Sequence, residues 1–416
     1  MKRFVSILAA LTLLCACLII PVSAESGQSG DSPVNLTFRQ DGSFKIIQVA
    51  DLQEFMFSSE ITRSFLYELA ERERPDLFVL TGDNIHCSAA DGFPRVVGRA
   101  MIKSGIDGYM NVFDQIYDDF GARVTMVFGN HDNEAMKTIT KAEEFVMYAA
   151  HRSFVGRYVA EADEGTEDEQ GQHYGTHNLP ISSSAGTAPV FGLWMFDSGS
   201  YDPRGGYSCV QKPQIDWFKA ANEATGKLPS LAFQHIAVPE VYDYLPQAGP
   251  NDPDAYRRDF VDDEGNEFSK YVYLTLPDGA KGQVRESAGS GKYNQGQCAA
   301  LDEAGNVLAL FWGHDHTNTY ELRRENGVDM VSSPATGFGS YGDHDMRGAR
   351  VITLTESDLT AYDTYVVTYC DFYGKNPLQQ TRIKLFNDLN SWANLIDIIT
   401  FRPFLWLLGL FAQIMR

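Results

Sequence analysis

Short apolar runs alternate with amphipathic stretches along the first third of the chain. Residues 44–50, 76–81 and 124–128 are mainly apolar, and their length is typical of buried strands. Residues 59–74 and 107–120 lie between these runs and have the spacing of apolar positions that predicts helices. The order strand, helix, strand, helix, strand predicts a parallel βαβαβ unit, and therefore a fold of the α/β class.

The same alternation continues to about residue 354. Residues 161–171 are acidic and poor in apolar residues, so we predict an exposed loop there. Residues 247–296 are rich in Gly, Pro, Asp and Tyr, which predicts a long insertion of the kind that often has a functional role. Helices are predicted over 139–158 and 213–225, and strands over 189–197, 230–233, 306–312, 328–333 and 349–354.

The N-terminus has the pattern of a secretory signal. Lys2 and Arg3 are basic, residues 7–20 are mainly apolar, and small residues end the segment at Ala24. We therefore predict a signal peptide over residues 1–24, a polar linker over 25–43, and a secreted or extracytoplasmic protein. A retained membrane anchor is the alternative, although the apolar run is short for a bilayer span.

The C-terminus is predicted to be a hydrophobic tail over residues 386–416, outside a domain that covers residues 44–385. Arg402 and Pro403 interrupt this tail, so its uninterrupted apolar run is too short to cross a bilayer. We expect the tail either to make a peripheral contact with a membrane surface, or to pack on a partner or on the domain itself.

The composition narrows the class of partner. A chain of 416 residues that is 44% hydrophobic and 21% charged is typical of a globular protein with a sizeable core. The formal net charge of −21 argues against nucleic acid as a general partner, because a phosphate backbone requires a basic surface. It does not exclude a small phosphate ester, because bound metal cations reverse the sign of the local charge. The cysteines beyond residue 24 (Cys87, Cys209, Cys298 and Cys370) form no CxxC pair, which excludes zinc-ribbon and thioredoxin motifs.

Polar residues able to bind metal follow most of the predicted strands. The carboxyl ends of parallel strands meet at one edge of a sheet, so residues far apart in the sequence are expected to gather there. Only nine histidines occur in the chain, and four of them stand at these positions. The candidate ligands are Asp51, Gln53, Asp83, Asn130, His131, His235, His314 and His316.

Carboxylate, amide and imidazole groups without a thiolate suit divalent or trivalent manganese, iron or zinc. Two such cations that share one carboxylate activate water and hold the oxygens of an in-line displacement at phosphorus. A histidine that is not a ligand then protonates the leaving group. Each motif alone has a structural alternative: Gly82-Asp83-Asn84 is ordinary turn chemistry, and an isolated His235 is more often a core residue.

Gly82-Asp83-Asn84, Gly129-Asn130-His131-Asp132, His235 and Gly313-His314-Asp315-His316, in this order, resemble the calcineurin-like metallophosphoesterases. Residues 233–240 and 313–318 are most similar to the branch that contains a yeast cell-cycle phosphatase and the plant probable inactive purple acid phosphatases. The resemblance extends over residues 44–354. It implies a four-layer αββα sandwich, two metal ions, and hydrolysis of small phosphate mono- or diesters by a metal-bridging hydroxide.

The resemblance also implies a role for individual residues. His131 would be the acid or charge-stabilising group, supported by Asp132. We expect Asn318 and Tyr201 on the substrate side of the site. The first metal would be held by Asp51, Asp83 and His316, with Gln53 beside them, and the second by Asp83, Asn130, His235 and His314.

Two positions depart from the family pattern. Gln53 stands where the family usually has a histidine, and an amide oxygen binds a transition metal more weakly than an imidazole does. A catalytically weak or inactive homologue that binds phosphate esters is therefore one alternative. His86 stands where purple acid phosphatases carry a tyrosine, and we hypothesise that it supplies the missing imidazole. A second alternative, based on the tail, is a membrane-associated hydrolase of lipid or cell-envelope phosphates.

Overall fold

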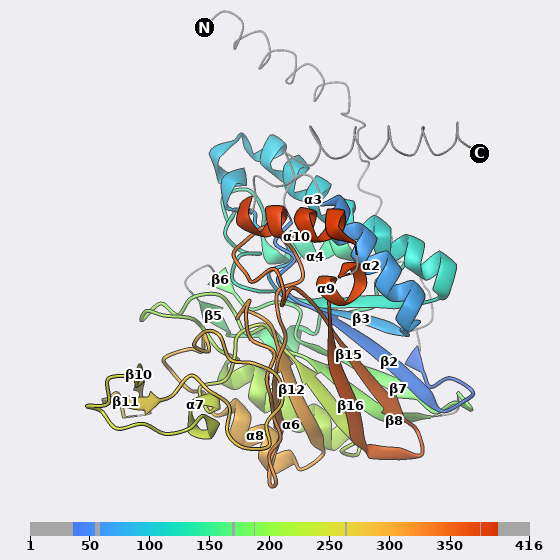
Figure 1. Cartoon of the computed structure of the whole chain (residues 1–416). Helices are drawn as coiled ribbons and strands as arrows, with labels where there is room; N and C mark the ends of the chain where they lie inside the picture. Colours follow the sequence, from blue (N-terminus) through green and yellow to red (C-terminus); the bar gives the residue numbers. More distant parts are fainter. Residues whose placement is uncertain are drawn as a thin grey trace, which may run out of the picture. The chain divides into compact units, whose positions relative to one another are not determined.

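The computed structural model describes residues 36–54, 59–168, 171–186, 188–262, 264–374 and 376–389 (Figure 1). All of these residues belong to one structural unit. The predicted signal peptide, most of the predicted linker before residue 36, and the predicted tail beyond residue 389 lie outside the described residues.

The predicted βαβαβ unit forms the centre of a five-stranded sheet with the order β16-β15-β2-β3-β4. Strands β2, β3 and β4 are parallel, and Ile47 is in register with Phe78, which is in register with Val124. Strands β15 and β16 extend the sheet in an antiparallel arrangement. The strands are β2 (Ser43–Val49), β3 (Leu77–Thr81), β4 (Arg123–Val127), β15 (Gly348–Thr355) and β16 (Asp358–Thr368), and the connecting helices are α2 (Glu60–Glu73) and α3 (Arg95–Phe120).

A second sheet has seven strands in the order β1-β7-β8-β9-β12-β14-β13. Its central strands β8, β9, β12 and β14 are parallel, whereas β7 and β13 run antiparallel to their neighbours β8 and β14. The strands are β1 (Leu36–Thr37), β7 (His177–Ser182), β8 (Pro189–Met195), β9 (Ser230–Phe233), β12 (Val307–Trp312), β13 (Glu321–Leu322) and β14 (Asp329–Ser332). The helices α6 (Lys212–Ala224) and α8 (Gln297–Ala304) lie between its strands in the sequence.

Alternate side chains of each central strand enter two different cores. In β3, Val79 packs in the core shared by strands of both sheets, whereas Phe78 packs against helices α2 and α3. In β12, Phe311 enters the shared core and Leu310 packs with residues of α6 and α8. Both faces of both sheets are therefore buried, and helices cover the two outer faces. The predicted four-layer αββα sandwich is confirmed.

The predicted helix over residues 139–158 is shorter in the structure. Helix α4 (Lys141–Ala149) begins at a capping box between Thr140 and Glu143. Beyond it, the Asp114 carboxylate accepts hydrogen bonds from the Ser153 backbone N–H (3.0 Å) and hydroxyl (2.7 Å). The backbone N–H of Val155 donates to the carbonyl of Val124 (2.7 Å), so this segment continues the edge of the sheet beside β4 instead of a helix.

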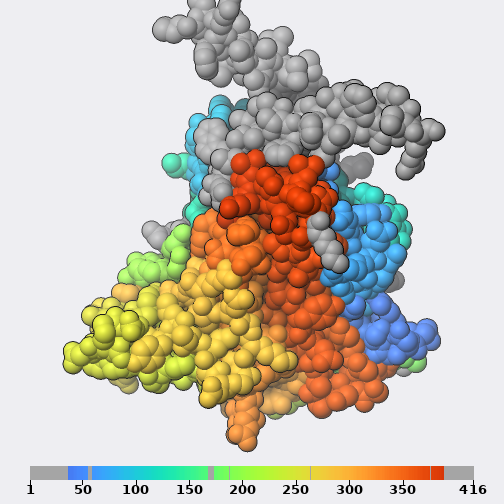
Figure 2. All heavy atoms as spheres, viewed as in Figure 1, coloured from blue at the N-terminus to red at the C-terminus, as the bar shows by residue number. Residues whose placement is uncertain are grey.

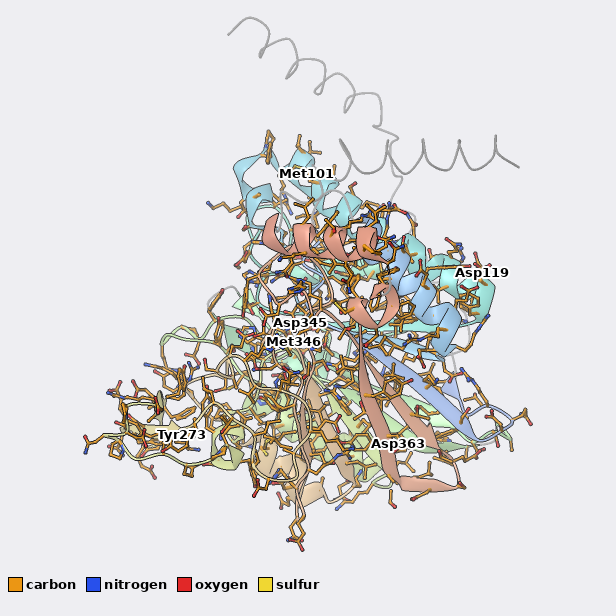
Figure 3. All side chains as sticks on the ribbon, viewed as in Figure 1. Met101, Asp119, Tyr273, Asp345, Met346 and Asp363 are labelled. Carbon is orange, nitrogen blue, oxygen red and sulfur yellow. The ribbon has the colours of Figure 1, made fainter. Side chains whose placement is uncertain are left out.

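The predicted insertion over residues 247–296 contains an antiparallel hairpin of β10 (Tyr256–Val261) and β11 (Glu267–Val272). Phe260 and Val272 are buried in the core on the helical side of the second sheet, so the insertion packs on the domain. It forms the yellow part of the face shown in Figure 2, and Figure 3 labels Tyr273 just after β11. The remaining short elements are η1 (Ser88–Gly92), α5 (Ala160–Asp163), β5 (Glu167–Asp168), β6 (Gly171–Gln172) and α7 (Val241–Tyr244).

The sandwich extends beyond the predicted boundaries at both ends. Strand β1 falls within the predicted linker over 25–43, and it pairs with β7 at the edge of the second sheet. Within the part of the chain that the structure describes, β16 is followed by the helices α9 (Tyr369–Tyr373) and α10 (Pro377–Leu389). Phe386 in α10 is buried against the first sheet's helical layer, so the predicted tail begins inside a packed helix. Among the described residues, no helix combines the length and the apolarity needed to cross a bilayer.

We expect Phe191→Ala to destabilise the protein by about 3–5 kcal/mol, because it leaves a cavity between the two sheets. Phe191 is 0% exposed and packs in the shared core. Val96→Ala is the control, since Val96 is 76% exposed and a surface change of this kind is expected to stay within about 0.5 kcal/mol. Urea unfolding monitored by tryptophan fluorescence measures both, and equal stabilities of the two variants would contradict this packing.

Candidate metal centre

The predicted metal ligands lie in loops that follow the parallel strands of both sheets. Asp51 and Gln53 follow β2, Asp83 follows β3, and Asn130 follows β4. His235 follows β9, and His314 and His316 follow β12 of the other sheet. The structure brings these residues together, and their contacts fall into two groups that share Asp83.

The first group surrounds His235. Its Nε2 atom lies 3.3 Å from Asp83 Oδ1, 3.2 Å from Asn130 Oδ1 and 3.2 Å from His314 Nδ1. The Nδ1 atom of His235 lies 2.9 Å from the carbonyl oxygen of Thr81, to which it donates its proton. This hydrogen bond holds the ring so that Nε2 faces the other three atoms, where it carries a proton in the metal-free protein and could bind a cation in the proton's place.

The second group surrounds Asp51. His316 Nε2 lies 3.3 Å from Asp51 Oδ1, and His316 Nδ1 lies 2.7 Å from the carbonyl oxygen of Tyr341, which accepts its proton. Gln53 Nε2 donates to Asp83 Oδ2 (3.2 Å). The two oxygens of Asp83 therefore face different groups, Oδ1 toward His235 and Oδ2 toward Gln53.

Two buried oxygens of the second group have no hydrogen-bond partner, namely Asp51 Oδ1 and Gln53 Oε1. A buried acceptor that lacks a donor is costly by about 1–3 kcal/mol, so cations at these positions would remove a real penalty. The pKa of His235 also indicates that the site attracts positive charge. Burial lowers the pKa of His235, but the charge of Asp83 outweighs it and raises the pKa to about 10. This donor set of carboxylate, amide and imidazole fits two divalent cations such as manganese, iron or zinc.

Several candidate ligands have an unfavourable backbone conformation. Among the described residues, six non-glycine residues have a positive φ, and four of them are Asp51 (52°), Gln53 (45°), Asp83 (49°) and His314 (69°). Such outliers concentrate at functional sites. The glycine before Asn130 has a different role, since a Cβ atom on Gly129 would lie 2.2 Å from Asp83 Oδ1.

His131 lies beside the two groups without joining either. Its backbone N–H donates to Asp83 Oδ1 (2.8 Å), while its Nε2 atom is 3.8 Å from Asp83 Oδ2. The Nδ1 atom hydrogen-bonds to Glu134 Oε1 (2.7 Å). Burial lowers the pKa of His131, but the hydrogen bond to Glu134 and the charge of Asp83 raise it to about 9. The imidazole can therefore hold a proton at neutral pH.

The support predicted from Asp132 comes from Glu134 instead. Asp132 is 0% exposed, and its carboxylate accepts hydrogen bonds from the backbone N–H groups of Gly129 (2.7 Å) and Ile85 (2.9 Å). It therefore holds the loop after β4 against the loop after β3. Adjacency to His131 in the sequence favoured Asp132, but the turn directs its side chain inward and brings Glu134, three residues on, under the imidazole.

The side chains of Asn318 and His86 also have other contacts than the sequence suggested. Asn318 is 0% exposed, and its Oδ1 accepts from the backbone N–H groups of Arg285 (2.9 Å) and Glu286 (3.2 Å), so it positions that loop instead of contacting substrate. His86 Nε2 lies 3.6 Å from Glu134 Oε2, and its ring is 4.9 Å from that of His131. Its contacts therefore lie on the His131 side, away from Asp51 and Gln53.

Tyr201, which we expect on the substrate side, contacts the candidate ligand Asn130. Its hydroxyl accepts a hydrogen bond from Asn130 Nδ2 (3.4 Å), and its ring stacks on Tyr207 at 5.7 Å. Tyr207 in turn meets the ring of His314 edge-on at 4.3 Å. The residues that the sequence left unassigned, Glu134 and Tyr207, contact the site through loops with no repeating pattern.

An αββα sandwich that gathers carboxylate, amide and imidazole groups at its strand ends has the architecture of a metal-dependent hydrolase. The model of the calcineurin-like phosphoesterase family matches residues 44–318, and the chain belongs to this family.

The sequence identities between this chain and individual relatives are low. The chain is 26% identical over 352 residues to probable inactive purple acid phosphatase 28 of Arabidopsis thaliana, which covers 76% of each chain. It is 23% identical over 318 residues to the phosphatase DCR2 of Saccharomyces cerevisiae, which covers 70% of this chain and 47% of the relative. A solved dimetal phosphatase from Danio rerio is similar over 78% of this chain and 98% of its own, with 14% identity and a TM-score of 0.43.

We expect Gly129→Ala to lower the metal content of the protein, because the added methyl group would displace the Asp83 carboxylate that both groups share. Gly92→Ala is the matched control, since a Cβ atom there meets nothing within 4 Å. Elemental analysis of protein loaded with manganese, iron or zinc measures bound metal per chain. Full metal content in the Gly129 variant would show that Asp83 is not a shared ligand.

Proposed function

We propose that the protein is an active phosphoesterase that hydrolyses phosphate mono- or diesters at this centre. The observation that carries the proposal is Asp83, whose two oxygens face two separate groups of ligands, with His131 alongside. The family membership supports the reaction class. When bound, two cations lower the pKa of water and hold the phosphoryl oxygens.

The side chains of this protein supply the remaining chemistry. Burial raises the pKa of Asp83, but the charge of His235 outweighs this effect and holds the pKa well below its usual range, so the carboxylate stays ionised. His131 carries a proton on Nδ1 toward Glu134 and a second on Nε2 when it is charged. In the hydrolysis, the oxygen of water bonds to phosphorus and its proton passes to solvent, while the ester P–O bond breaks and the leaving alkoxide takes the Nε2 proton of His131, which solvent then restores.

The second candidate is a homologue that binds phosphate esters without turning them over. Gln53 favours this candidate, because its amide stands in the group around Asp51 where an imidazole would bind a transition metal more tightly. Some of the relatives are themselves named probable inactive purple acid phosphatases.

Metal analysis combined with a substrate screen separates the two candidates. The full chain is loaded with manganese, iron or zinc, assayed for metal content, and tested on an aryl phosphate and a bis-aryl phosphate. An active enzyme binds two metals per chain and releases the aryl alcohol. One bound metal or none, with no turnover of either ester, would identify the binding protein instead.

We also propose export, which rests on the pattern of residues 1–24. Peripheral membrane contact rests on the apolar composition of the segment after residue 389. N-terminal sequencing of the mature protein tests the first proposal, with Glu25 as the expected first residue. Vesicle sedimentation of the full chain and of a chain truncated after Asn390 tests the second, and equal sedimentation of the two would end it.

We expect His131→Ala to keep its metal content but lose roughly 10²- to 10⁴-fold in kcat, because the leaving alkoxide no longer receives a proton. Glu134→Gln should show a smaller loss, since it weakens the orientation of the imidazole without removing it. The control is His344→Ala, because His344 is exposed and no hydrogen bond of its side chain ties it to the site. The substrate is an alkyl phosphate, whose alkoxide needs the proton, and unchanged turnover of His131→Ala on it would remove His131 from the reaction.

A further inference from the structure

A cavity of about 310 Å³ opens over the candidate metal centre. Its wall includes Asp83, His131 and His314, and also Arg258, which comes from strand β10 of the insertion. Among the described residues that line this cavity, Arg258 is the only lysine or arginine. The insertion therefore delivers one permanent positive charge to the place where a phosphate ester would bind.

The guanidinium of Arg258 has few hydrogen-bond partners for a partly buried charged group. One Nη2 hydrogen bond goes to the carbonyl oxygen of Ser290, and the Nε atom is buried with no hydrogen-bond partner. Among the described residues, no carboxylate forms an ion pair with Arg258. A buried donor on a charged group that lacks an acceptor is unfavourable, so the guanidinium is suited to an anion.

Other arginines of the same region are compensated. Arg257, its neighbour on β10, is exposed and pairs with Asp259 (2.7 Å). Arg285 pairs with Asp343 (2.8 Å) and with Asp345 (2.8 Å), and Figure 3 labels Asp345. Arg258 therefore differs from these two arginines in having no carboxylate partner, in a chain whose net charge is −21.

Three of the four carboxylate oxygens of Glu286 and Asp315 in the cavity wall accept hydrogen bonds from other donors. The fourth, Asp315 Oδ2, has no hydrogen-bond partner and so does not bind Arg258. Glu286 Oε1 accepts from the backbone N–H of Thr317 (2.6 Å), and Glu286 Oε2 accepts from the hydroxyl of Tyr341 (2.6 Å). Asp315 Oδ1 accepts from the backbone N–H of Gly289 (2.7 Å). The positive charge of Arg258 is therefore available to a ligand instead of serving the wall.

Arg258 is also held in place by a segment that packs against the candidate ligands. The Ser290 carbonyl that it contacts belongs to the segment whose Gly289 is bonded to Asp315, between His314 and His316. A Cβ atom on Gly289 would lie 2.5 Å from the ring of His314, so this segment lies directly against the candidate ligands. The guanidinium is thus tied to the loop that follows β12.

We propose that Arg258 binds a non-bridging oxygen of the phosphoryl group and makes phosphate monoesters the substrate class; this inference rests on the proposed function. A monoester carries one more anionic oxygen than a diester, in which that oxygen bears a second substituent. A guanidinium donates to phosphate oxygens through its planar fork of N–H groups. A cation at this position therefore favours the dianionic ester over the singly charged one.

The test compares Arg258→Gln with Arg257→Gln, a matched change of the adjacent residue on the same strand. We expect Arg258→Gln to lose about 10²- to 10³-fold in kcat/KM on an aryl phosphate monoester, the size typical of a lost transition-state donor. On a bis-aryl phosphate the change should stay within about threefold, and inhibition by inorganic phosphate should weaken at least tenfold. Arg257→Gln should match the wild type, and metal content should be the same in all three proteins.

Several outcomes would overturn the inference. An equal loss on both esters would show that Arg258 does not select monoesters, and monoester kcat/KM within about threefold of the wild type would remove it from the site. Arg258→Lys keeps the charge, so it tests the role if the glutamine variant does not fold: its monoester kcat/KM should fall by less than about tenfold, and a loss of about 10²-fold or more would contradict the role of the charge. If the wild type binds two metals but hydrolyses neither ester, the proposed function fails. The anion site is then tested separately, by comparing the calorimetric affinity for inorganic phosphate of the wild type with that of Arg258→Gln.

Discussion

The site depends on one buried carboxylate. Asp83 is 1% exposed, and its Oδ1 atom faces His235 of the second sheet while its Oδ2 atom faces Gln53 of the first. A buried charge is tolerated only where partners compensate it, so the loops after β3, β4 and β9 must all reach this one residue. The contact between the two sheets is therefore electrostatic at the site and hydrophobic beneath it.

The sandwich explains how strained residues persist around that carboxylate. Asp51, Gln53 and Asp83 all have a positive φ, a conformation that costs of order 1–3 kcal/mol each. Both sheets are buried on both faces, and side chains such as Phe233 and Phe311 stack between them at 5.2 Å. Each strand end is thus fixed by a core on two sides, which holds the ligand loops in conformations that isolated turns would avoid.

The sequence predicted the layers, and it predicted which residues would meet at the strand ends, because both follow from local patterns. A strand such as β3 is a continuous apolar run, and the candidate ligand Asp83 follows two residues after its end. The roles of Asp132 and Asn318 could not be predicted, because a side chain's direction after a turn depends on the backbone of other loops. Asp132 turns toward the N–H of Ile85, and Asn318 toward the N–H of Arg285, neither of which is a sequence neighbour.

The insertion follows a different rule from the strands. Its composition predicted a long insertion over 247–296, but no periodicity indicated that Arg258 would face the cavity while Arg257 faces solvent. Alternation along β10 accounts for this, because successive side chains of a strand point to opposite faces. The candidate ligands therefore lie at the strand ends of the family's fold, whereas the arginine that we propose selects the substrate lies in a segment outside the sandwich. Reactivity and selectivity can change separately in such an arrangement, because Arg258 lies on a hairpin of the insertion whereas the candidate ligands lie at strand ends of the sandwich.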